Sequence, residues 1–179
     1  MPISENRKIY IENKVKEFNS EIEDIPINIV LLARKNGFVV QRLNLDRKTF
    51  GILLYSHYDN LAGLDTRKLI VVKSGLSEEQ SRYILAHELG YYRLFSKENI
   101  IAHKMCDGFF DNPKEQEADY FAQVLLMPSE SVKNDIDDNS DKEISDEDII
   151  SKISLKYNVS KNLAVKRFYE ILPKTSRQK

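Results

Sequence analysis

A histidine and a glutamate stand side by side, as His87 and Glu88, in the stretch SRYILAHELGYY at residues 81–92. Apolar and aromatic residues recur around this pair at the spacing of a helix that buries one side. His87 and Tyr91 therefore lie one turn apart on the same side of that helix. In the HExxH zinc signature, histidines at these two positions bind one metal ion, and the glutamate acts on a water molecule. Here the motif reads HELGY, so a phenol occupies the second ligand position.

The start of this helix is clearly marked. Ser77 and Gln80 have the spacing of a capping box, in which each side chain bonds to the backbone of the other residue. The helix is predicted to run to about Leu94 or Phe95, with Gly90 in its interior. Because a glycine inside a helix costs about 1 kcal/mol relative to alanine, Gly90 indicates that something packs closely against the backbone there.

A second helix is predicted at residues 114–127, because an Asn-Pro pair directly before it supplies an N-cap and a first-turn proline. Glu115 and Asp119 are one turn apart on this helix and project together. Small alanines on part of that side allow close helix packing, which brings Glu115 within reach of His87. Zinc peptidases of the gluzincin type take a third ligand from a later helix, and an acid one turn further on bonds a ligand histidine. Glu115 and Asp119 have that spacing.

The remaining segments complete an α+β fold with a small sheet of three or four strands and a C-terminal helical hairpin. Strands are predicted at residues 38–43, 50–55 and 69–73. Further helices are predicted at residues 4–18, 26–37, 145–157 and 161–172. The acidic run at residues 135–148 is predicted to be a solvated loop.

The chain has the length of one compact domain, or of one core with a small appendage, at 179 residues. We expect a main domain at residues 1–134, with the helical hairpin at residues 145–173 packed on it. Its two helices and tight turn resemble a helix-turn-helix, but such hairpins are commonly packing units. DNA contact is therefore not expected to be the main role.

Composition limits the classes of partner. The 27 basic and 28 acidic residues give a formal charge of -1, which argues against broad contact with nucleic acid or an anionic membrane. Cys106 is the single cysteine, so no disulfide can form within the chain. The N-terminus lacks the apolar core of a signal peptide, and no apolar run has the length of a membrane span. We expect a cytoplasmic protein with no membrane contact.

The predicted strand at residues 69–73 leads directly into the helix of His87 and is expected beside it. Two interpretations are open. As an edge strand, it would accept a peptide by strand addition. As a buried strand, it would only pack. His57 falls in a turn region and is expected to be solvated.

Several stretches resemble the ImmA/IrrE family of zinc metallopeptidases. They are PINIVLLARKNGFVV at residues 26–40, LIVVKSGLSEEQSRYILAHELGYYRL at 69–94, EQEADYFAQVLLMP at 115–128 and ISLKYNVSKNLAVKRF at 153–168. Together they cover most of the chain from Pro26 onward. The resemblance implies a metallopeptidase-like domain at residues 1–134 and a Zn²⁺ cofactor.

The resemblance also implies roles for single residues. His87 matches the first zinc ligand, and Glu88 matches the general base that takes a proton from the attacking water. Glu115 matches the third ligand, and Asp119 matches the acid that holds a ligand histidine. Glu117 competes with Glu115 for the ligand role, since the sequence does not fix the rotation of the helix.

Tyr91 stands where the family has a histidine. Ionising a phenol at pH 7 costs about 4 kcal/mol before any metal contributes, since its reference pKa is near 10. One possibility is that another group completes the zinc shell: Tyr91 as a phenolate, His103 or a water. If His103 is not a zinc ligand, it is interpreted as a surface histidine. Alternatively, the tyrosine is a natural loss of the catalytic site, which gives a pseudoenzyme, or a substitution in an active parent sequence.

The first functional hypothesis is a zinc-dependent peptidase, a hydrolase that cleaves a regulatory protein. From the resemblance, its partner would be a helix-turn-helix repressor. The alternative is a non-catalytic module on the same fold that holds a peptide or a repressor. A further alternative is a DNA-binding regulator that acts through residues 153–168.

Overall fold

The computed structural model describes residues 2–19, 24–56, 68–96, 100–106, 112–140 and 144–172. Within these ranges the helices are α1 (Glu5–Phe18), α2 (Ile29–Lys35), α3 (Glu78–Phe95), α4 (Pro113–Leu126), α5 (Ser129–Ser140), α6 (Asp146–Tyr157) and α7 (Lys161–Ile171). The strands are β1 (Val39–Leu43), β2 (Thr49–Ser56), β3 (Lys68–Lys73) and β4 (Ile100–Cys106). The predicted α+β class is confirmed. His57 lies outside the described residues.

The four strands form one sheet in the order β1-β3-β2-β4. β1 runs parallel to β3, while β2 runs antiparallel to both β3 and β4. Because β3 lies between two other strands, both of its edges are already paired. The interpretation of residues 69–73 as a peptide-accepting edge strand is therefore wrong, and the buried-strand interpretation is correct.

Strand β4 was not predicted, and it forms the edge of the sheet next to β2. Its register places His103 opposite Leu53, a residue with no exposed surface. Side chains alternate along the strand, so His103 is buried while Ala102 and Lys104 are exposed. β4 therefore turns His103 toward the interior.

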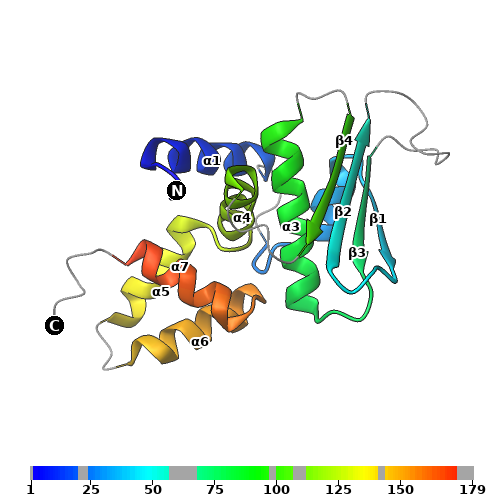
Figure 1. The fold of residues 1–179 in the computed structure, drawn as a ribbon. Coiled ribbons are helices and arrows are strands. Elements are labelled where there is room, and N and C mark those ends of the chain that lie inside the picture. Colours follow the sequence, from blue (N-terminus) through cyan, green and yellow to red (C-terminus); the bar gives the residue numbers. More distant parts are fainter. Residues whose placement is uncertain are drawn as a thin grey trace.

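Helix α3 packs across one face of the sheet, and α4 packs on the opposite side of α3 (Figure 1). α1 packs against α4, with Ile11 and Val15 buried. Helices α5, α6 and α7 gather into a group at the end of the molecule away from the sheet (Figure 1). α3 is thus the central element, in contact with the sheet on one side and with α4 on the other.

The predicted start and interior of α3 are confirmed. Ser77 Oγ accepts a hydrogen bond from the Gln80 amide at 3.2 Å, and Gln80 Oε1 accepts one from the Ser77 amide at 3.0 Å. At Gly90, an added Cβ would lie 2.8–3.0 Å from the Phe121 side chain of α4. The glycine therefore lets α3 and α4 approach closely enough for their side chains to meet.

Two helices differ from the prediction. α2 begins at Ile29, where the Asn28 side chain caps the Leu31 amide, and not at Pro26. α5 extends into the acidic run at residues 135–148, so residues 135–140 are helical and not a loop, because Val132 and Ile136 fall one turn apart and are both buried. One apolar stripe is enough to hold an otherwise acidic helix on the core.

Two buried arginines attach the C-terminal helices. The Arg82 guanidinium of α3 donates to the backbone carbonyls of Ile27, Tyr157 and Asn158. Arg167 of α7, which is 1% exposed, donates to the Met127 carbonyl and to Ser129 Oγ. The hairpin is therefore packed on the main core through charge-assisted hydrogen bonds.

Within the described residues, none of the helices is both long and apolar enough to cross a membrane.

We predict that Gly90→Ala destabilises the protein although alanine is the better helix former. Alanine gains about 1 kcal/mol of helix propensity. Overpacking a core costs about 1–3 kcal/mol, and the Phe121 ring that the new methyl meets is fully buried. We expect a net loss of about 1 kcal/mol, measured as a fall in Tm of roughly 2–4 °C.

The control is the double variant Gly90→Ala, Phe121→Leu, which removes the ring that the new methyl meets. It should be more stable than the sum of the two single effects. If Gly90→Ala alone left the protein as stable as the parent, the helices would not be in close contact there.

Candidate metal centre

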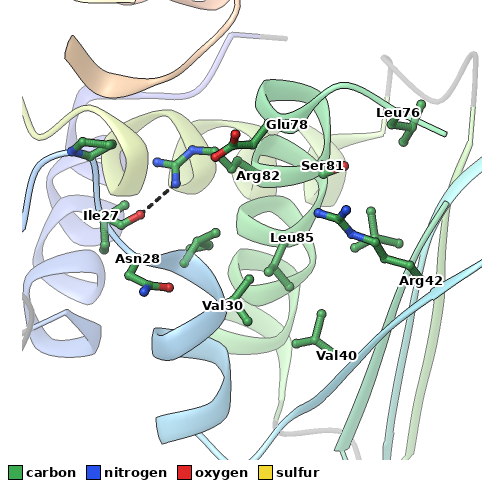
Figure 2. A pocket seen from close by; sticks show the side chains of 13 residues that line it. Ile27, Asn28, Val30, Val40, Arg42, Leu76, Glu78, Ser81, Arg82 and Leu85 are labelled. Carbon is green, nitrogen blue, oxygen red and sulfur yellow. Dashed lines mark hydrogen bonds between the residues drawn. The ribbon is translucent and has the colours of Figure 1, made fainter. Parts of the chain in front are cut away.

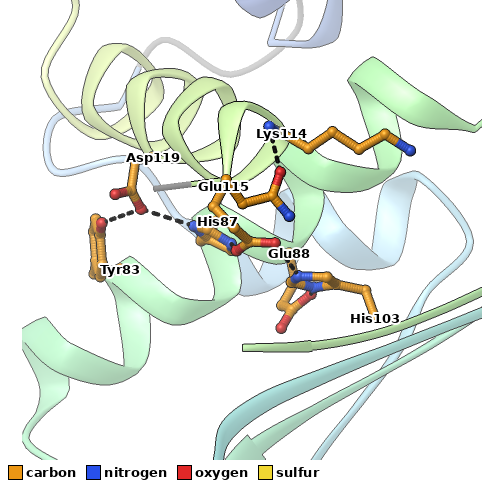
Figure 3. Close-up of polar contacts among 8 residues, drawn as sticks. Tyr83, His87, Glu88, His103, Lys114, Glu115 and Asp119 are labelled. Atoms are coloured by element: carbon orange, nitrogen blue, oxygen red, sulfur yellow. Dashed lines mark hydrogen bonds and ion pairs between the residues drawn. The ribbon is translucent and has the colours of Figure 1, made fainter. Parts of the chain in front are cut away.

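Side chains from three elements converge beside α3. His87 comes from α3, Glu115 from α4 and His103 from β4 (Figure 3). Each offers one nitrogen or oxygen, and these atoms all lie within 4.8 Å of one another. Because capping and close packing fix the two helices, and the β2 register fixes β4, the three groups meet without a loop to position them.

Glu115 lies between the two imidazoles. Its Oε2 is 3.2 Å from His87 Nε2, and its Oε1 is 2.8 Å from His103 Nε2. The two rings are nearly parallel, with centroids 5.7 Å apart. The Nε2 atoms of both histidines therefore face one carboxylate.

The other nitrogen of each imidazole contacts a different acid. His87 Nδ1 is 2.9 Å from Asp119 Oδ1, which also accepts a hydrogen bond from the Tyr83 hydroxyl at 2.5 Å. His103 Nδ1 is 2.7 Å from Glu88 Oε2. A proton on Nδ1 in both rings would satisfy these acids and leave both Nε2 lone pairs for a cation.

These contacts strongly change the acidity of the groups. Burial alone would lower the pKa of His87, but its hydrogen bonds to Asp119 and Glu115 outweigh burial and raise that pKa to about 9. The pKa of His103 rises to about 9 in the same way, against burial, through Glu115 and Glu88. For Glu115 burial raises the pKa, but the two histidines lower it to about 2.

The charges of the cluster suit a divalent cation. Three carboxylates (Glu88, Glu115 and Asp119) with two protonated imidazoles carry one net negative charge. The same carboxylates with two neutral imidazoles and one divalent cation also carry one net negative charge. A metal ion can therefore replace two protons without changing the net charge that the surroundings must hold.

The donor set fits zinc. Two imidazole nitrogens and one carboxylate oxygen, with one open position, form a common catalytic zinc set. Ligand atoms around tetrahedral zinc lie about 3.3 Å apart, given bonds of about 2.0–2.1 Å. The three donor atoms here all lie within 4.8 Å of one another, so small side-chain rotations would bring them onto one ion.

Tyr91 lies flat against His103. The two ring centroids are 3.8 Å apart and the ring planes differ by 18°. His103 is only 7% exposed, so its interpretation as a surface histidine is wrong; pairing of β4 with β2 buries it. That Tyr91 itself contacts a metal stays a prediction.

The two acids that compete for the third ligand position face different partners. Glu117 accepts hydrogen bonds from Arg7 Nε at 2.9 Å and Arg7 Nη2 at 2.6 Å, so it points toward α1. Glu115 points at both histidines. The helix rotation that the sequence left open therefore brings Glu115, and not Glu117, into the cluster.

His103 is the member of this cluster that was assigned no firm role from sequence. The only local signal is a short apolar stretch that ends directly before His103. The approach of β4 to α3 depends on pairing with β2, about fifty residues earlier in the chain. A contact between residues so far apart in the chain cannot be predicted from the residues around His103.

A hollow of about 500 Å³ lies on a different side of α3, lined by Ser81, Arg82 and Leu85 together with residues of α2 and β1 (Figure 2). His87 is about 200° further round the helix than Leu85, so this hollow is separate from the metal centre. Arg82 is already bonded to backbone carbonyls. Among the described residues, no group of potential metal ligands lines this hollow.

Comparison with known proteins gives one clear relationship. The sequence model of the Peptidase M78 family, described as the IrrE N-terminal-like domain, matches residues 33–169. A search of curated proteins gave no match. The matched range includes α3, α4 and β4, the three elements that supply the cluster. Since the match covers most of the chain, the protein belongs to this metallopeptidase family, as its resemblance to ImmA/IrrE proteins predicted.

Proposed function

We propose that the protein is a zinc-dependent peptidase whose metal is held by His87, His103 and Glu115. The observation that carries this proposal is the convergence of three donor groups from α3, β4 and α4 in one cluster. Membership of a peptidase family supports peptide hydrolysis as the reaction. His103 would take the place of the histidine that position 91 lacks.

When bound, zinc supplies Lewis-acid chemistry toward a peptide carbonyl and lowers the pKa of water. Asp119 and Tyr83 would fix the His87 ring, with Nδ1 on the carboxylate. The family resemblance assigns the role of base to Glu88, and the contact of Glu88 with His103 Nδ1 at 2.7 Å is the observation that opposes this role. A regulatory protein, of the helix-turn-helix repressor type, is the proposed substrate, and the cytoplasm is the proposed location.

A second candidate function is a non-catalytic module that binds a peptide or a repressor. The observation that favours it is the state of Glu88, which has no exposed surface and is bonded to His103. A base held in this way has to leave His103 before it can reach a substrate. The DNA-binding alternative has less support, because hydrogen bonds of Arg82 and Arg167 pack the hairpin on the core of the protein.

The metal ligands can be identified by substitution. We expect about one zinc per chain by elemental analysis, and at least a hundredfold weaker affinity after His87→Ala, His103→Ala or Glu115→Ala, because each removes a first ligand. Two matched controls should keep the parent affinity. Glu117→Ala removes an acid from the same helix, and Tyr91→Phe keeps the ring stack but removes the hydroxyl.

If Tyr91→Phe lost zinc as severely as His103→Ala, the phenol would be identified as a ligand. That result would contradict the ligand set proposed above.

Activity separates the two candidate functions. The zinc-loaded protein should cleave members of a fluorogenic peptide library, and a chelator or His87→Ala should abolish the cleavage. Zinc restored to the chelated protein should restore it. A protein that binds zinc fully, and still cleaves no library member or helix-turn-helix repressor, is the non-catalytic module.

The pH dependence of stability follows from the shifted pKa values in the metal-free protein. Both histidines have raised pKa values, so the stability they contribute is complete below about pH 6.5 and is lost as the pH rises through about 9. Glu115 has a lowered pKa, so its contribution is present above about pH 4.5 and is lost as the pH falls through about 2.

We therefore expect the Tm in excess chelator to fall between about pH 6.5 and 9. Zinc should raise the Tm most at the upper end of this range, because fewer protons compete there. His57→Ala is the control and should keep the same profile. A flat metal-free profile would show that the two imidazoles do not carry shared protons in the cluster.

A further inference from the structure

Glu88 is the residue whose surroundings fit its motif role least well. Its side chain is fully buried. One oxygen, Oε2, contacts His103 Nδ1 at 2.7 Å. The other, Oε1, has no hydrogen-bond partner among the described residues. The link from Glu88 to the metal centre therefore runs through the His103 ring.

A glycine makes this position available to Glu88. A Cβ at Gly51 of β2 would lie 2.7 Å from Glu88 Oε1 and 2.6 Å from the Ile84 side chain. Any larger residue at position 51 would push the carboxylate away from β2. The space beside Gly51 therefore lets the Glu88 side chain of α3 extend across β2 to His103 of β4.

The pair of Glu88 and His103 repeats the pair of Asp119 and His87. In both pairs, a carboxylate oxygen lies within 2.9 Å of Nδ1, while Nε2 of the same ring faces Glu115. A carboxylate on Nδ1 holds the proton there, which fixes the ring orientation and makes Nε2 the metal-binding atom. Both imidazoles are thus oriented by the same device, from opposite sides of Glu115 (Figure 3).

We infer that Glu88 is a positioning residue that holds His103 as the second histidine ligand, with its proton on Nδ1 and its Nε2 toward the metal. Tyr91 supports the same ring from its face, by stacking at 3.8 Å. The HELGY motif thus still serves a two-histidine centre: its glutamate and its tyrosine together orient a histidine that comes from another element. This inference rests on the metal site of the proposed function.

A positioning role and a base role give opposite results when zinc binding is measured. A base acts in the reaction, so its removal lowers kcat and leaves the zinc affinity unchanged. A carboxylate that orients a ligand contributes to metal affinity, typically by about 10–100-fold. Zinc affinity without any substrate therefore distinguishes the two roles.

The experiment is a competition titration of zinc with a chromophoric chelator on the full chain. We expect Glu88→Ala to weaken zinc binding by about 10–100-fold, and Asp119→Ala to do the same at the other histidine. Glu88→Gln should stay within a few-fold of the parent, because an amide oxygen still accepts the Nδ1 proton. In a His103→Ala background, Glu88→Ala should cause no additional loss.

A second measurement needs no substitution at Glu88. Two-bond ¹⁵N–¹H correlation spectra of the zinc-loaded protein, with His57 replaced by alanine to remove its signals, should show His103 bound through Nε2 and protonated at Nδ1. This result remains obtainable if Glu88→Ala fails to fold.

The outcomes separate the inference from the proposed function. If His87→Ala and Glu115→Ala leave zinc binding unchanged, the proposed metal site is wrong. If these two variants lose zinc while Glu88→Ala keeps the parent affinity with His103 in place, the site stands and the positioning role of Glu88 is overturned. A His103 ring bound through Nδ1 would also overturn it.

Discussion

The structure depends on a buried network in which three carboxylates share two imidazoles. Unpaired, the fully buried Glu88 above all would be costly, because a charge inside a protein needs an opposite charge or a hydrogen bond. Here Glu115 receives both Nε2 atoms, while Asp119 and Glu88 each receive one Nδ1. The network is balanced by two protons or by one divalent cation. Binding of the proposed metal would therefore be coupled to folding through the same side chains.

The scaffold gives this network its geometry through two close approaches. Gly90 lets α4 pack on α3, which sets Glu115 and Asp119 over His87. Gly51 lets α3 lie against β2, which sets Glu88 beside His103 of the next strand. Because neither glycine has a side chain, polar groups from separate elements can come into contact beside it.

Much of this arrangement could be predicted because its signals are local. The capping box at Ser77, the interior Gly90 and the one-turn spacing of Glu115 and Asp119 all depend on residues a few positions apart. The choice between Glu115 and Glu117 could not be made, because it needs the rotation of α4, which Arg7 of α1 helps to set.

The role of His103 could not be predicted for a related reason. Its burial depends on the pairing of β4 with β2 and on the packing of α3 over both strands. The motif also drew attention to position 91, where a tyrosine reads as a lost ligand. In three dimensions the tyrosine ring is stacked on His103, the histidine that we propose as the second ligand.

The most direct test is a crystal structure of the zinc-loaded protein with anomalous data at the zinc edge. We predict one zinc within about 2.0–2.2 Å of His87 Nε2, His103 Nε2 and a Glu115 oxygen. Glu88 should remain on His103 Nδ1. Zinc bound to the Tyr91 hydroxyl, with His103 outside the coordination shell, would contradict it.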